Sequence, residues 1–314
     1  RDAALRGAHG RRPRRLTRVR CESSVGADSE RLSLREHLPG IIRSWAPGWF
    51  VRQGRVISRM MPGTNVRCRW RVSSRHDLYR ISSAWVKEPG TIAWIVDEVR
   101  PGDVVWDIGA NIGIYSVPLG HRVRGNGGRV VAVEPNLVNA ASLLTNVVLN
   151  GLGDVVQIVA EPIAERSIQG LIPMRTSHLE SGKSGVQLVA PGGVGLGLDP
   201  HGSVHRVVRS LSGPELASLT RSRPDIIKID VDGLDFEILR GLREILTGRT
   251  RPRLISVEMT SGEPRFVDLM EAVGYRLREM NFGMLGGQKI REGWDPTTVS
   301  GNGIFVPVEA PTRE

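Results

Sequence analysis

The sequence predicts an α/β fold in which a mostly parallel sheet has helices on both faces. The first observation is that short apolar runs alternate with stretches of helical period, the pattern of strands joined by helical crossovers. The second is that 314 residues with 40% hydrophobic content can bury a sizeable core. The third is that four expected strands end in a carboxylate: Asp107, Glu134, Asp230 and Glu258. Because ligands bind at this edge of such sheets, the strand ends are the candidate site.

The first 80 residues differ from the rest in charge. They contain 19 arginines and 6 acidic residues, a net charge of +13, whereas residues 81–314 have a net charge of −3. Residues 1–30 are rich in Arg, Ser and Gly and are expected to be disordered. This basic arm is either a solvated extension or a segment that binds nucleic acid or an anionic membrane.

Residues 31–84 are expected to form an accessory segment, in which weak alternation at 66–79 predicts strands. Because no apolar run reaches about 18 residues, no spanning helix is expected. No apolar segment follows the first arginines, so no signal peptide is expected, and the expected location is the cytoplasm. Two cysteines, Cys21 and Cys68, are too few for a disulfide framework or a four-thiolate zinc site, which favours a reducing compartment.

Residues 85–314 are expected to form the main domain, with a glycine-rich insertion or lid at 167–209. Short bounded apolar runs predict strands at 104–108, 129–133, 155–159, 226–230, 254–257, 275–280 and 303–308. Helical periodicity predicts helices at 91–100, after a turn at 109–113, and at 137–150, 214–221, 236–246 and 265–273. In the helix at 137–150, the side chains expected to face inward are Leu143, Leu144, Val147 and Val148.

The turn after the first of these strands has the spacing Gly-x-Asn-x-Gly, not the Gly-x-Gly-x-x-Gly of dinucleotide-binding turns. Asp107 precedes its first glycine, Gly109, by two residues. At about 4 Å and an effective dielectric of about 20, a carboxylate would repel a pyrophosphate charge by about 4 kcal/mol. It would favour a cationic ligand such as S-adenosylmethionine (SAM), which has an ammonium and a sulfonium group and no phosphate. The alternative is a tight turn in which Asp107 only caps the following helix.

Glu134 ends the second strand of the main domain, about 25 residues after the turn. An acid at this place accepts hydrogen bonds from a ribose diol, which suits SAM and NAD equally. The alternative is an acid stabilised by the dipole of the next helix.

Lys228 and Asp230 point to the same side of the strand at 226–230, because side chains alternate along a strand. A lysine in an apolar strand requires a carboxylate partner. Asp230 could orient the methionyl end of a cofactor or take a proton from an acceptor hydroxyl. The alternative is a buried structural ion pair.

Three strings together resemble the motifs of FkbM-type methyltransferases. They are residues 101–116, then Glu134-Pro135-Asn136 with Asn146 and Asn150, then residues 227–233 with Glu237 and Gly241. The resemblance covers residues 85–310 and implies the class I methyltransferase fold, a Rossmann-like sheet of seven strands with the last one antiparallel. It also implies SAM as cofactor and, as acceptor, a hydroxyl on a sugar, glycan or natural-product small molecule.

The resemblance also implies the roles of individual residues. Asp107, Gly109 and Asn111 would hold the methionyl part of SAM, and Glu134 its ribose. Asp230 would lie near the transferring methyl as the catalytic residue, and Glu88 resembles an acid that faces the cofactor. The expected cofactor-binding set is completed by Ala110, Gly113, Tyr115, Pro135, Asn136 and Ala164. The chain departs from the family at Asp232, where a glutamate is usual, and at residues 210–212, where Thr-Leu-Asp is usual.

Two other functions stay open on the sequence. One is a nicotinamide-dependent oxidoreductase, and the other is a non-catalytic or RNA-binding relative that uses the basic arm. The net charge of −3 over residues 81–314 argues against a nucleic-acid substrate. Candidates for a general base are Asp230 and four histidines: His121, His178, His201 and His205. No cluster has metal-ligand spacing, so no metal is predicted.

Overall fold

The structure is a computed structural model. It describes residues 54–165, 171–176, 180–183, 186–188, 204–231, 233–259, 264–281, 287–289 and 300–308. Three parts of the sequence analysis lie outside these residues. They are the predicted disorder at 1–30, the accessory segment before residue 54 and much of the expected insertion.

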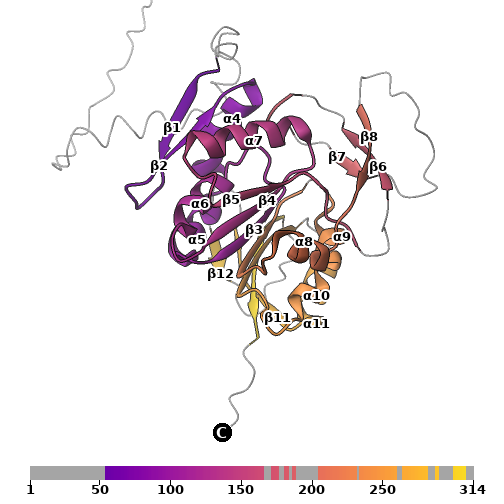
Figure 1. The fold of residues 1–314 in the computed structure, drawn as a ribbon. Coiled ribbons are helices and arrows are strands. Elements are labelled where there is room, and N and C mark those ends of the chain that lie inside the picture. Colours follow the sequence, from indigo (N-terminus) through magenta and orange to yellow (C-terminus); the bar gives the residue numbers. More distant parts are fainter. Residues whose placement is uncertain are drawn as a thin grey trace, which may run out of the picture. The chain divides into compact units, whose positions relative to one another are not determined.

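An eight-stranded sheet forms the centre of the fold (Figure 1). In spatial order its strands are β5 (Val156–Val159), β4 (Arg129–Val133), β3 (Val104–Ile108), β9 (Ile226–Ile229), β10 (Leu254–Met259), β13 (Gly301–Pro307), β11 (Tyr275–Asn281) and β12 (Gly287–Lys289). The first five are parallel, and β13 runs antiparallel between β10 and β11. The predicted seven-stranded sheet with an antiparallel last strand is therefore confirmed. The short edge strand β12, antiparallel to β11, is an addition that the sequence pattern did not predict.

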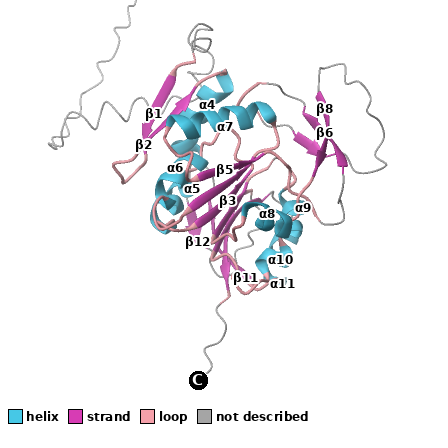
Figure 2. Cartoon of the chain, in the orientation of Figure 1, coloured by secondary structure: helices cyan, strands magenta, loops and turns pink. Residues whose placement is uncertain are grey.

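Helices cover both faces of this sheet (Figure 2). Alternate side chains of each central strand enter two separate apolar clusters. Val105 and Ile226 belong to the first cluster, and Trp106 and Ile227 belong to the second. Because both faces are buried, these strands are near-continuous apolar runs. The first cluster includes side chains of α5 (Pro89–Glu98), α6 (Ser116–Val123) and α7 (Leu137–Leu149). The second includes side chains of α8 (Gly213–Thr220), α9 (Asp235–Gly241), α10 (Arg243–Leu246) and α11 (Arg265–Ala272).

Helix α7 buries a narrower apolar face than the sequence suggested. Leu143 and Val147 are buried as predicted, but Leu144 and Val148 are 56% and 66% exposed, so that part of the prediction was wrong. The adjacent buried positions are polar instead. Asn146 donates to the Ile112 carbonyl at 2.8 Å and accepts from the N–H of Arg71 at 2.8 Å. These bonds tie α7 to two earlier segments of the chain, the turn after β3 and the stretch around Arg71.

The chain before the main sheet forms a hairpin, β1 (Val56–Met60) and β2 (Arg67–Arg71), followed by α4 (Arg75–Lys87). The strand predicted over 66–79 is therefore half correct. The Ser74 side chain accepts from the N–H of Asp77, whose carboxylate accepts in return, and this capping box starts a helix where a strand was expected.

The boundary expected between residues 84 and 85 falls inside α4. Trp70 of β2 and Trp85 of α4 pack edge to face with centroids 5.8 Å apart. Both belong to the same apolar cluster as Val105 and Val130 of the sheet. The Trp70 indole also donates to the Gly113 carbonyl at 3.1 Å. The part of 31–84 that the structure describes is thus built into the main core.

The expected insertion contains a three-stranded antiparallel sheet of β6 (Leu171–Thr176), β7 (Val186–Leu188) and β8 (Val204–Arg209). The single helix predicted at 236–246 is divided into α9 and α10 at Leu242.

Within the described parts of the chain, no helix has the length and apolarity to span a bilayer.

Candidate active site

Two adjoining cavities lie at the carboxyl ends of the parallel strands. The first is lined by the last residues of β3 and β4, by residues just beyond β4 and β9, and by Glu258 of β10. The second lies between α4 and the turn after β3, with Tyr115 on its wall. The cavities share seven lining residues: Arg80, Lys87, Glu88, Gly109, Asn111, Lys183 and Asp230. The structure therefore has cavities at the strand ends, where the sequence predicted the site.

The turn after β3 requires its glycine at position 109. Gly109 has a φ of +85°, and an added Cβ would lie 2.0 Å from the carbonyl oxygen of Asp230. The backbones beyond β3 and β9 thus approach as closely as glycine allows. Asn111 also has a positive φ, +50°, and its own Oδ1 accepts from the N–H of Ile112 at 2.9 Å. This local bond offsets part of the strain.

The N–H groups of this turn all have acceptors within the protein. The Val133 carbonyl accepts from residues 109 and 110 at 2.9 and 3.0 Å, and the Glu134 carboxylate accepts from residue 111 at 2.8 Å. The N–H groups of residues 112 and 113 bond within the turn. A dinucleotide-binding turn presents free N–H groups to a pyrophosphate. This turn has its N–H groups bonded internally and lies beside the carboxylates of Glu134 and Asp230, which suits a cationic ligand.

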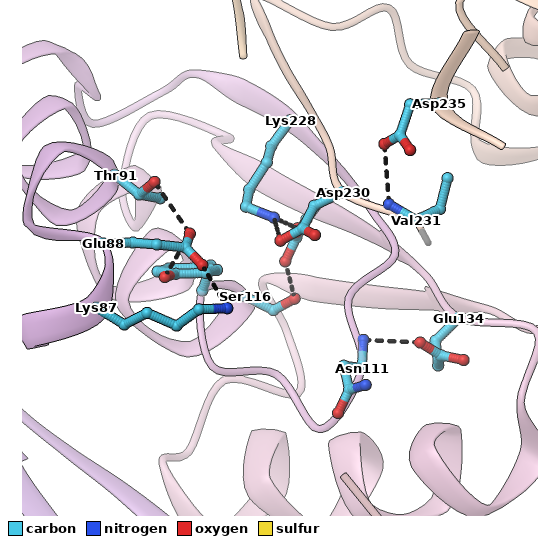
Figure 3. Close-up of polar contacts among 12 residues, drawn as sticks. Lys87, Glu88, Thr91, Asn111, Ser116, Glu134, Lys228, Asp230, Val231 and Asp235 are labelled. Atoms are coloured by element: carbon cyan, nitrogen blue, oxygen red, sulfur yellow. Dashed lines mark hydrogen bonds and ion pairs between the residues drawn. The ribbon is translucent and has the colours of Figure 1, made fainter. Parts of the chain in front are cut away.

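Glu134 follows β4 and is 5% exposed. Its two carboxylate oxygens accept from the N–H groups of Asn111 and Asn136, both at 2.8 Å (Figure 3). Burial raises the pKa of this carboxyl to about 7, against the opposing effect of the two N–H bonds. Because a carboxylate offers about four lone-pair sites, two remain for hydroxyl donors in the cavity.

Lys228 is buried between two carboxylates. Its Nζ lies 2.8 Å from Asp230 Oδ2 and 3.9 Å from Asp107 Oδ1 (Figure 3). Burial alone would lower the pKa of Lys228, but the two acids outweigh burial and raise it. Burial would raise the pKa of Asp230, but Lys228 outweighs it and lowers that pKa. Asp230, 32% exposed, therefore presents an ionised carboxylate to both cavities.

Glu88 lies where the two cavities meet. Its Oε2 accepts from the Tyr115 hydroxyl at 2.9 Å and from the Thr91 hydroxyl at 3.3 Å. Lys228 lies over the Tyr115 ring, 4.8 Å from its centroid. Burial, followed by the charge of Glu88, raises the pKa of Tyr115 well above its ordinary value, so the hydroxyl stays protonated and donates. The hydroxyl and the ion pair hold Glu88 and Asp230 as two fixed carboxylates beside the turn.

Known proteins resemble this chain in sequence and in fold. Residues 107–282 match the methyltransferase FkbM domain. The chain belongs to the FkbM methyltransferase family. The family that the sequence resembles is therefore confirmed.

A curated relative is the hexuronic acid methyltransferase AglP of Haloferax volcanii, 25% identical over 183 residues. The alignment covers 57% of this chain and 65% of that protein, just short of two thirds of its length. Similar solved structures include methyltransferase FkbM of Methylobacillus flagellatus KT, with 14% identity, a TM-score of 0.40, and 73% of this chain and 53% of that chain covered. A SAM-dependent methyltransferase of Aquifex aeolicus has 13% identity and a TM-score of 0.40, and the match covers 71% of this chain and 92% of that chain.

Most residues that the FkbM resemblance predicted for the cofactor do line a cavity: Glu88, Gly109, Ala110, Asn111, Tyr115, Glu134, Pro135 and Asp230. Asp107 lines neither cavity. It is 1% exposed, accepts from the Ser116 hydroxyl at 2.5 Å and lies 3.9 Å from the Lys228 ammonium.

Three more predicted residues lie outside the lining. Gly113 has a φ of +84°, and an added Cβ there would lie 2.6 Å from the Leu143 side chain. Its carbonyl accepts from the Trp70 indole. Asn136 is 2% exposed and caps α7 by accepting from the N–H of Val138 at 3.0 Å. Ala164 is 3% exposed and packs its carbonyl against Gly241, while its predecessors Pro162 and Ile163 line the first cavity.

Sequence reasoning missed the contribution of α4. Five of its polar residues recur at intervals of three and four and line the second cavity: His76, Tyr79, Arg80, Ser83 and Lys87. This periodicity is visible in the sequence, but the prediction of strands over 66–79 hid it. Lys183 and Asn139 were also missed, and no short-range pattern points to them.

The histidines proposed as bases gain no support as a group. His121 lines neither cavity, and burial lowers its pKa. His178, His201 and the side chain of His205 lie outside the described residues, as does Asp232. Among the side chains that are described, no group of three or more His, Cys, Asp and Glu is arranged around a common metal position.

Proposed function

We propose that the first cavity binds SAM and that the enzyme transfers its methyl group to a hydroxyl oxygen of a sugar, glycan or other natural product. The observation that carries the proposal is the row of carboxylates, Glu134, Asp230 and Glu88, beside a turn whose N–H groups are all bonded internally. Such a lining favours a cationic cofactor with a ribose diol over one with a pyrophosphate.

Each part of SAM has a matching group in the lining. The free lone pairs of Glu134 would accept from the ribose hydroxyls. The apolar side chains of Ile163, Leu234 and Ile238 would contact the adenine. Asp230 would face the ammonium group, and Gly109 leaves room for the methionyl chain against the backbone.

SAM, when bound, supplies an electrophilic methyl group on sulfur. The acceptor oxygen forms a bond to the methyl carbon as the carbon–sulfur bond breaks, and S-adenosylhomocysteine and the acceptor proton leave. The contribution expected of this chain is mainly alignment of donor and acceptor at about 3–3.5 Å. Because Lys228 lowers the pKa of Asp230, that carboxylate suits charge stabilisation better than proton abstraction.

The class of acceptor rests on the curated relative, which is described as a hexuronic acid methyltransferase. We carry over from it only the sugar class. The nicotinamide alternative is disfavoured by the bonded turn, and no nucleic-acid partner is proposed because residues 81–314 have a net charge of −3.

Methyl transfer can be tested with radiolabelled SAM and a panel of free glycosides and flavonoid-type alcohols. The proposal expects label in at least one acceptor, with S-adenosylhomocysteine formed in equal amount. Label that enters only protein, RNA or nitrogen nucleophiles would overturn it.

A further inference from the structure

The second cavity opens beside the proposed SAM site and shares seven lining residues with it, among them Gly109, Glu88 and Asp230. From there it extends along one face of α4. An acceptor in this cavity would therefore lie next to the part of the first cavity where the methyl group is expected. The role of the second cavity as an acceptor site rests on the proposed function.

The charged side chains of this lining are predominantly cationic. Arg80, Lys87 and Lys183 face it, against the two carboxylates Glu88 and Asp230, and all five also line the first cavity. Both carboxylates already have partners: Asp230 bonds Lys228 from below at 2.8 Å, and Glu88 accepts from Tyr115 at 2.9 Å. SAM would add one net positive charge beside them. Its carboxylate can pair with one of the three cations, and Lys87 lies 3.7 Å from Glu88, which leaves one cation for an acceptor.

Lys183 lies in the lining of the second cavity because it belongs to a turn of the insertion, residues 180–183, that is hydrogen-bonded to α7 and to the residue that caps α4. The Ser181 carbonyl accepts from the hydroxyl of Ser74, the residue that caps α4, at 2.5 Å. Asn139 of α7 accepts from the N–H of Gly182 and donates to the carbonyl of Lys183, both at 2.9 Å. Arg80 also donates to the Gly182 carbonyl. The turn is therefore held between α4 and α7 at the rim shared by both cavities.

The Lys183 ammonium has an outer partner that does not compete for the cavity. Its Nζ lies 3.3 Å from Glu180, whose side chain is 62% exposed and is not part of either lining. Such an exposed pair is weak and can yield to a ligand carboxylate. The Lys183 side chain, 29% exposed, thus lies between solvent and the second cavity.

We propose that the acceptor is a sugar that bears a carboxylate, and that Lys183 is the residue that selects it. Arg80 and Lys87 add to the positive charge of the same cavity. The role of Lys183 is recognition of the acceptor and not the transfer step itself. A second source of a carboxylate is the methionyl end of SAM, and the experiment separates the two.

The experiment titrates methyl β-D-glucuronide and, separately, methyl β-D-glucoside into the full-length protein saturated with S-adenosylhomocysteine. The wild type is expected to bind the glucuronide and to bind the glucoside at least tenfold more weakly. Lys183→Met is expected to weaken glucuronide binding by about tenfold to a hundredfold, the effect of a lost charge-assisted hydrogen bond. Lys183→Arg should restore most of it, and S-adenosylhomocysteine affinity should stay within about twofold in both variants. Arg243→Gln, which removes an exposed charge of α10 that belongs to neither lining, is the matched control and should bind like the wild type.

Equal binding of the two glycosides, no binding of the glucuronide, or an unchanged Lys183→Met would overturn the inference. A loss of S-adenosylhomocysteine binding in Lys183→Met would assign the lysine to the cofactor and would also overturn it. Failure of the folded wild type to bind S-adenosylhomocysteine would instead contradict the proposed function. Circular dichroism of each variant distinguishes these results from misfolding.

Discussion

At the scale of single residues, Glu134 links ligand binding to pH. Two backbone N–H groups hold its carboxylate in place, while burial raises its pKa to about 7. Ribose hydroxyls donate best to the ionised form, so SAM binding would favour loss of the proton and pull the pKa down. The affinity is then fully present above pH 7 and is lost as the pH falls through about 7.

The dissociation constant of SAM is accordingly expected to rise below pH 7, approaching about tenfold per pH unit. Calorimetric titration between about pH 5.5 and about pH 8.5 measures this. Glu134→Gln, which cannot ionise, should bind weakly and with a flat pH profile. A wild-type affinity independent of pH over this range would rule out Glu134 as the ribose acceptor.

Lys228 stabilises two acids, Asp230 at 2.8 Å and Asp107 at 3.9 Å. Lys228→Met would leave Asp107, 1% exposed, as a buried charge without its counter-ion. Breaking a buried ion pair in this way costs about 3–5 kcal/mol of the free energy of unfolding. Urea unfolding measures the loss. Lys87→Met is the control: this lysine is 61% exposed and 3.7 Å from Glu88, so its loss should cost less than about 1 kcal/mol. Similar effects of the two variants would contradict the role given to Lys228.

At the scale of elements, the turn after β3 depends on the absence of a side chain at Gly109. Gly109→Ala would place a methyl group 2.0 Å from the Asp230 carbonyl and would force the ends of β3 and β9 apart. We expect a loss of more than about 2 kcal/mol in unfolding free energy and a loss of SAM affinity. Gly127→Ala separates the two causes, because Gly127 has a similar φ, +79°, with nothing within 4 Å of an added Cβ. It should cost only about 1 kcal/mol. Equal costs would show that the close approach at Gly109 has no consequence.

The elements that sequence reasoning predicted well are those with one strong local signal. The strands β3, β4 and β9 are buried on both faces, so they are visible as near-continuous apolar runs. Asp107, Glu134 and Asp230 lie at or just beyond their carboxyl ends. Helix α4 was missed because its start depends on one capping box, Ser74 with Asp77, next to an alternating stretch that imitates a strand.

The site could be predicted only in part, for a related physical reason. Glu134 and Asp230 lie at strand ends, and the parallel sheet itself brings them together. Lys183 reaches the cavity through a turn whose hydrogen bonds go to Ser74 and Asn139, partners that are distant in sequence. Asp107 matches the motif but is covered by Lys228, and spacing alone does not reveal such burial.

At the scale of the whole molecule, the hairpin and α4 complete both the core and the site. Trp70 and Trp85 pack in the cluster beside the sheet, and Arg80 and Glu88 line the cavities. A chain shortened to begin at residue 89 would expose this apolar face and lose one wall of the site.

We expect the chain that begins at residue 89 to lack a cooperative thermal transition by circular dichroism. A chain that begins at residue 54 should unfold cooperatively and keep wild-type SAM affinity, since the residues lining the cavities are all retained. A shortened chain from residue 89 that folded and bound SAM normally would restore the domain boundary expected from the sequence.

The proposed function depends above all on SAM binding in the carboxylate-lined cavity at the strand ends. Calorimetric titration of SAM, with NADH titrated in parallel, measures this binding directly. We expect saturable one-site binding of SAM to the wild type, loss of that binding in Glu134→Ala, and no binding of NADH. A folded wild type that binds NADH and not SAM would show that the cavity holds a different cofactor.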